Sequence, residues 1–171
     1  WAYESLTFGG YWAWDPVENA SLVPWLILIS GIHTLLIYKH SGHSLRATNL
    51  FLILTFGFVL YSTFLTRSGI LGETSVHAFT DLGMNMQLLI FLLIFVLPAL
   101  VLFIYRYKDI PTIHKEEITS SREFWMFIGS LVFFLSALVI IGKTSIPVVN
   151  KIWGTKIAPP EKAEFSYNQI M

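Results

Sequence analysis

Aromatic residues are concentrated near the start of the sequence and could form a surface for a flat, apolar ligand. Residues 9–26, GGYWAWDPVENASLVPWL, hold three of the six tryptophans and one tyrosine, and contain no lysine or arginine. The glycine pair before Tyr11, Trp12 and Trp14 allows close backbone approach and unusual torsions. A planar macrocycle would suit rings at this density. Tryptophan also gathers at membrane interfaces, and we prefer that interpretation for the isolated Trp25.

The acidic residues of the same stretch have a local explanation that needs no ligand. Asp15 can cap the N-terminus of a helix, with Pro16 at the first helical position and Glu18 where a capping box places its acid. Ser21 offers a second start, because Pro24 would then fall in the first helical turn. We therefore expect a helix to begin after Asp15 or after Ser21.

Two histidines are candidate metal ligands. His33 lies in an apolar stretch, about 12 residues or ~18 Å of helix beyond Ser21, where ionisable groups usually face a partner or a cavity. A hydrogen bond between helices and ligation of a haem iron both remain open for this imidazole. His77 lies in a polar connection, where a histidine is most often solvated. Arg67 in the same connection could anchor the chain at the interface or bind a carboxylate with bidentate geometry.

The composition is typical of a membrane protein. The 171 residues are 54% apolar and only 13% charged, which is too hydrophobic for one small soluble core. The formal net charge of zero argues against nucleic acid as a partner. The absence of cysteine excludes disulfides, thiolate nucleophiles and Cys-ligated metals. Because the sequence begins at Trp1 without a basic leader, we interpret it as a piece of a longer protein.

Four stretches have the length and apolarity of membrane spans, each close to the ~20 residues that a helix needs to cross the hydrocarbon. None of them contains Lys, Arg, Asp or Glu. We therefore predict an all-α integral membrane protein with about four transmembrane helices of a larger polytopic bundle. The predicted spans are residues 22–38, 48–65, 87–105 and 124–142.

The distribution of basic residues predicts the orientation of these spans. Six basic residues lie in the inner connections, residues 39–47 and 106–123, whereas residues 1–21 contain none and residues 66–86 contain one. Because cytoplasmic connections carry such an excess, we expect the 1–21 and 66–86 segments to face the periplasm at the plasma (inner) membrane. The segment 143–171 would lie on the same external side, although it contains four lysines.

Two segments of the sequence resemble one family. FGGYWAWDPVENASLVPWL, residues 8–26, is similar to the tryptophan-rich WWD signature of the haem-handling proteins of cytochrome c maturation, the CcmF/CcmC/CcsA-like proteins. TRSGILGETSVHAF, residues 66–79, resembles the stretch that follows this signature in the CcmF-type cytochrome c haem lyases. The resemblance continues more weakly through SREFW and the fourth predicted span, so it covers nearly the whole chain.

The resemblance implies contacts with two haems. His77 matches the histidine associated with the iron of an external haem, and His33 matches a transmembrane histidine that ligates a b-type haem. The family supplies the second histidine of each pair from outside this sequence. The other residues that we expect to bind the external haem are Tyr11, Trp12, Trp14, Asp15, Trp25 and Arg67.

On this resemblance, the intact protein holds haem at the outer membrane face and ligates it to apocytochrome c, together with other cytochrome c maturation proteins. No residue here has the partners of a conventional acid, base or nucleophile, so the catalytic residues are unknown and the segment alone is not expected to be active. One alternative is a haem export or loading module of the same WWD family without lyase activity. Another is a structural membrane subunit whose aromatic residues only anchor it.

Overall fold

The computed structural model describes residues 12–72, 74, 75, 77, 79, 83–113 and 121–157. These residues form five helices and no strand. The first four are long and apolar enough to cross a membrane, and each contains one of the predicted spans. The described part of the chain is therefore all-helical, with the long apolar helices of a multi-pass membrane protein, as predicted. The helices are α2 (Pro16–Ser41), α3 (Leu45–Arg67), α4 (Asn85–Tyr105), α5 (Arg122–Thr144) and α6 (Ile146–Trp153).

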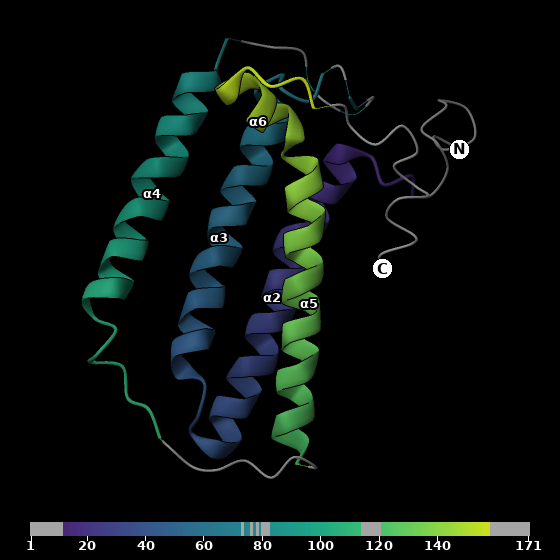
Figure 1. The fold of residues 1–171 in the computed structure, drawn as a ribbon. Coiled ribbons are helices and arrows are strands. Elements are labelled where there is room, and N and C mark those ends of the chain that lie inside the picture. The colour runs from purple at the N-terminus through teal and green to yellow at the C-terminus, as the bar shows by residue number, and fades with distance from the viewer. Residues whose placement is uncertain are drawn as a thin grey trace.

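The four long helices run alternately in opposite directions, so their connections gather at two ends of the bundle (Figure 1). One end holds the start of α2, the end of α3, the start of α4 and the short helix α6. Helix α2 packs against both α3 and α5, whereas α4 packs mainly against α3. The segment before α2 and the connection that contains His77 therefore lie at the same end.

Helix α2 begins at the first of its two predicted starts. Asp15 accepts a hydrogen bond from the backbone N–H of Val17 at 2.9 Å, and Glu18 accepts one from the backbone N–H of Asp15, which completes the capping box. Pro24 consequently lies inside the helix. The helix ends at Ser41 and is capped by Gly42, whose φ of 77° is a left-handed conformation that glycine adopts without strain.

Small and polar residues allow α2 to approach its two neighbours closely. On the α5 side, the Ser30 hydroxyl donates to the Ser130 carbonyl oxygen at 3.0 Å, and the Ser130 hydroxyl donates to the Ser30 carbonyl oxygen at 3.2 Å. Such bonds satisfy groups that would be costly to expose to hydrocarbon. On the α3 side, a Cβ added to Gly31 would lie only 3.2 Å from the Cβ of Phe51. Both contacts depend on residues with little or no side chain.

One buried apolar cluster follows the contact of α2 with α5, and partly buried leucines of α4 pack against a second one. The second cluster consists of Ala20, Phe64, Leu65 and Leu71. Helix α4 has no buried residue, so most of its apolar surface is exposed within the described structure. In a membrane, lipid or further spans cover such a surface. The exposed face of α4 thus fits the predicted larger bundle. The cluster between α2 and α5 consists of Val23, Leu26, Ile27, Ala137 and Ile140.

We predict that Gly31→Leu weakens the bundle, because its side chain would meet the backbone and Cβ of Phe51. Overpacking of this kind costs about 1–3 kcal/mol. Thermal unfolding of the full-length protein in detergent measures the effect. Gly142→Leu is the matched control, since nothing lies within 4 Å of a Cβ added there. Equal melting temperatures for the two variants would contradict the close packing at Gly31.

Candidate functional site

The segment that leads into α2 makes a tight turn at Trp14. The φ angle of Trp14 is 55°, which is uncommon for a residue with a Cβ. The Glu18 carboxylate accepts hydrogen bonds from the backbone N–H groups of Ala13 and Asp15, at 3.0 and 3.2 Å. The buried side chain of Asn19 donates to the carbonyl oxygen of Trp14 at 2.9 Å. The first turn of α2 therefore fixes the path of the aromatic segment.

Trp12 and Trp14 form an edge-to-face pair, with ring centroids 5.9 Å apart and planes at 88°. Trp14 packs against the core between α2 and α5, whereas Trp12 is 37% exposed. The exposed indole thus rests on a ring that is anchored in the bundle, and we call this pair the Trp12–Trp14 ledge. Tyr11, the third ring predicted here, lies outside the described residues.

The connection after α3 brings His77 to the start of α2. His77 Nδ1 lies 3.4 Å from Asp15 Oδ2, and the Ser75 hydroxyl donates a hydrogen bond to the same oxygen. Ser75 Oγ also accepts from the backbone N–H of His77 at 3.1 Å. The side chains of His77 and Asp15 are 25% and 11% exposed. The two motifs singled out in the sequence therefore meet in one cluster.

Arg67 and Trp25 form no hydrogen bond or ion pair with this cluster in the described part of the chain. Arg67 is the last residue of α3, and its guanidinium carbon lies 5.2 Å from the centroid of the Phe79 ring. Trp25 is 55% exposed on α2, almost three turns beyond Asp15. The position of Trp25 fits an interfacial anchor, the interpretation preferred from the sequence.

His33 lies against α5 and is remote from the cluster. Its Nδ1 is 2.8 Å from the carbonyl oxygen of Ile29 in the same helix. Because a carbonyl oxygen can only accept, Nδ1 carries a hydrogen, and neutral His33 keeps its lone pair on Nε2. A Cβ added to Gly129 would lie 3.7 Å from Nε2, and the Phe133 ring centroid is 5.7 Å from that of His33. The helical rise separates His33 from Asp15 by ~27 Å.

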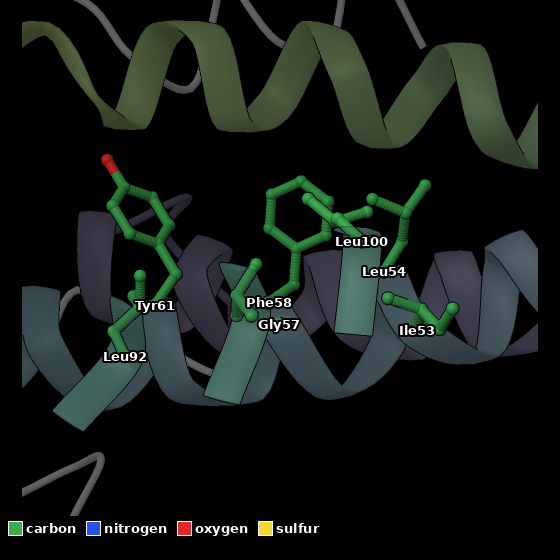
Figure 2. Close-up of a pocket in the computed structure, with 8 residues that line it drawn as sticks. Ile53, Leu54, Gly57, Phe58, Tyr61, Leu92 and Leu100 are labelled. Atoms are coloured by element: carbon green, nitrogen blue, oxygen red, sulfur yellow. The ribbon is translucent and has the colours of Figure 1, made fainter. Parts of the chain in front are cut away.

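An apolar cavity of about 190 Å³ lies between α3 and α4, away from these candidates (Figure 2). The hydroxyl of Tyr61 points toward α5, where it shares a 2.8 Å hydrogen bond with Ser145. The cavity has no histidine and suits an apolar occupant rather than an iron. No cluster of three or more metal-binding side chains occurs in the described residues. The lining consists of Ile53, Leu54, Gly57, Phe58, Tyr61, Leu92, Val96 and Leu100.

The sequence did not predict the roles of Asn19 and Ser75. Asn19 is a polar residue next to the capping box, and Ser75 stands two residues before His77. Neither residue can be assigned a contact from its place in the sequence. Both contacts depend on how segments outside α2 fold back onto its first turn. Their roles follow from the tertiary contacts of Asn19 with Trp14 and of Ser75 with Asp15.

Comparison with known proteins relates the chain to one family. Residues 1–71 match the family model described as cytochrome C assembly protein. The chain is 39% identical to the cytochrome c-type biogenesis protein CcmF of Pseudomonas aeruginosa over 94% of its length, and 36% identical to CcmF of Escherichia coli over 90%. Over most of its own length, the chain is thus similar to a part of CcmF. A further relative is the cytochrome c-type biogenesis protein ccl1 of Rhodobacter capsulatus, 34% identical over 92% of the chain.

The chain spans 24% of the length of each of these three relatives. No solved structure matches it significantly. All three relatives are named for cytochrome c-type biogenesis. In the described fold, four helices are long and apolar enough to cross a membrane.

We predict that Asn19→Ala loosens the turn at Trp14, because the buried amide that binds its carbonyl oxygen is removed. Leaving such a group without its partner costs about 1–3 kcal/mol. Hydrogen–deuterium exchange of the segment 12–19 in the full-length protein should accelerate. Ser21→Ala is the control, since Ser21 is exposed and bonds only to its own helix. Unchanged exchange in Asn19→Ala would show that Asn19 does not hold the turn.

Proposed function

We propose that the chain is the haem-handling part of a cytochrome c maturation protein, which holds haem at the outer membrane face for ligation to apocytochrome c. The observation that carries the proposal is the contact of His77 with Asp15, directly beside the Trp12–Trp14 ledge. A nitrogen ligand for iron and an exposed flat apolar surface thereby lie at one end of the bundle. The similarity to proteins named for cytochrome c-type biogenesis supports the same process.

At the proposed external site, each group has a distinct task. Trp12 contacts the apolar porphyrin and shields it from water, while His77 binds the iron. Arg67, exposed at the same end, pairs with a propionate. The chain supplies orientation and electrostatics, whereas haem vinyl groups and the cysteine thiols of apocytochrome c, both substrates, form the thioether bonds.

The proposed internal site is a b-type haem with His33 as one ligand. The bond from Nδ1 to the Ile29 carbonyl oxygen supports this role, because Nε2 then has the lone pair that ligation requires. When bound, such a haem supplies electrons to the external one. On the family resemblance, a second histidine for each haem would come from outside the present sequence.

The proposed location is the inner (plasma) membrane, with the Trp12–Trp14 ledge in the periplasm. Among the described residues, four basic side chains lie at the ledge end, three of them at or beyond the last turn of α5. Charge in such a trailing segment has less influence on orientation than charge in short connections. Five basic side chains lie at the opposite end, in or next to the short connections: Lys39, Arg46, Arg106, Lys108 and Arg122.

Alanine substitution of the two histidines tests the ligand assignments in the full-length protein. We expect His77→Ala to lose the external haem and to lower the yield of cytochrome c, and His33→Ala to lose the absorbance of the b-type haem. Optical spectra of oxidised and reduced protein measure both losses. His40→Ala, at the opposite end of α2, should retain both haems. Wild-type spectra and cytochrome c yield in both variants would remove the assignments.

Substitution of the exposed ledge residue separates haem binding from membrane anchoring. We expect Trp12→Leu to lower haem affinity by roughly two- to tenfold, since an aromatic contact contributes about 0.5–1.5 kcal/mol. Haem titration of the full-length protein gives the affinity. Trp153→Leu is the matched control, because Trp153 is a tryptophan of α6 that is 70% exposed. A loss of thermal stability without any change in haem affinity would favour a structural subunit instead.

A further inference from the structure

One carboxylate oxygen connects three separate parts of the site. Asp15 Oδ2 accepts from the backbone N–H of Val17 in α2 and from the hydroxyl of Ser75, and it lies 3.4 Å from His77 Nδ1. The Asp15 side chain is nearly buried, at 11% exposure. Burial of a carboxylate is favourable only when hydrogen bonds and partners compensate it, so this oxygen is held by several contacts at once.

The geometry determines which nitrogen of His77 faces which partner. Nδ1 lies 3.4 Å from Asp15 Oδ2, close enough for an electrostatic contact but without hydrogen-bond geometry. Because a carboxylate can only accept, its negative charge favours the tautomer with the proton on Nδ1. In neutral His77, the lone pair then resides on Nε2, which is the form of imidazole that binds a metal. A metal-binding histidine commonly gives its second ring N–H to a carboxylate, which fixes the ring and makes it a stronger ligand.

The N-cap explains why this carboxylate can orient a histidine from a connecting segment. The capping bonds tie Asp15 to the first turn of α2, which is itself packed between α3 and α5. Ser75 binds both the Asp15 carboxylate and the backbone N–H of His77, so it ties the connection to the same point. Trp14 directly precedes Asp15, so Asp15 fixes the position of the Trp12–Trp14 ledge as well as that of His77.

We propose that Asp15 is the positioning residue of the external haem site, whose carboxylate selects the tautomer and orientation of His77 with the help of Ser75. This inference rests on the proposed function, because it takes His77 as the iron ligand. In this role Asp15 acts through His77, which differs from the direct haem contact expected from the sequence. Its two tasks, starting α2 and orienting His77, are separable by substitution.

Asp15→Asn in the full-length protein separates the two tasks. Asparagine caps a helix about as well as aspartate, so the start of α2 and the melting temperature should be retained. Haem affinity at the external site should fall by roughly 10- to 100-fold, as is typical when such a supporting group is removed. The midpoint potential of that haem should become more positive, because a less electron-rich imidazole stabilises oxidised iron less.

Two further variants keep the test decisive. Glu18→Gln is the matched control, because in the described part of the chain the Glu18 side chain bonds only to backbone N–H groups of the turn. Both bonds end on one oxygen, Oε2, and the amide oxygen of glutamine can accept them in its place. The external haem of this variant should keep the wild-type affinity and potential. Ser75→Ala leaves the capping bond of Val17 in place, and should weaken haem binding in the same direction as Asp15→Asn even if the latter folds poorly.

A double-mutant cycle distinguishes the inference from the proposed function. If Asp15 acts through His77, adding Asp15→Asn to His77→Ala should leave unchanged the weak residual haem affinity that titration of His77→Ala measures. Additive losses, or wild-type affinity and potential in both Asp15→Asn and Ser75→Ala, would overturn the positioning role while leaving His77 as a ligand. Wild-type haem binding in His77→Ala alone would instead overturn the proposed function.

Discussion

The close packing of α2 between α3 and α5 is the constraint on which the other features depend. Ser30 and Gly31 allow this approach, one through reciprocal hydrogen bonds to α5 and the other through the absence of a side chain toward α3. In hydrocarbon there is little hydrophobic drive to join apolar helices, so such contacts contribute much of the specificity of packing. Because α2 is held from two sides, groups at its start and along its length are fixed relative to the bundle.

Both candidate sites use this one helix as their support. Asp15 is the cap of α2 and contacts His77, while His33 lies inside α2 and faces α5. The separation along the helix axis is determined by the rise per residue and not by a connecting segment. In the proposed function, the spatial relation of the two haems therefore follows from the stiffness of α2, whose first turn also sets the direction of the Trp12–Trp14 ledge.

The features that could be predicted from the sequence are those with local causes. The spans follow from uninterrupted apolarity, and the start of α2 follows from the spacing of Asp15 and Glu18. The contact of Asp15 with His77 could not be derived in this way, because it depends on how the connection after α3 folds back. The same holds for the φ angle of Trp14, which is stabilised by the backbone hydrogen bonds that Glu18 accepts and by the one that Asn19 donates. Helix α6 was not predicted either, since eight residues after α5 are too few for a strong periodic signal.

The hydrogen bond from His33 Nδ1 to the Ile29 carbonyl oxygen has a consequence for recognition. The ring is oriented by its own helix, so no neighbouring segment is needed to choose its tautomer. A group that docks against Nε2 therefore meets an imidazole that has already lost its rotational freedom, and the entropic cost of ordering it is incurred during folding, before docking. His77 differs, because its orientation exists only once two distant segments have come together.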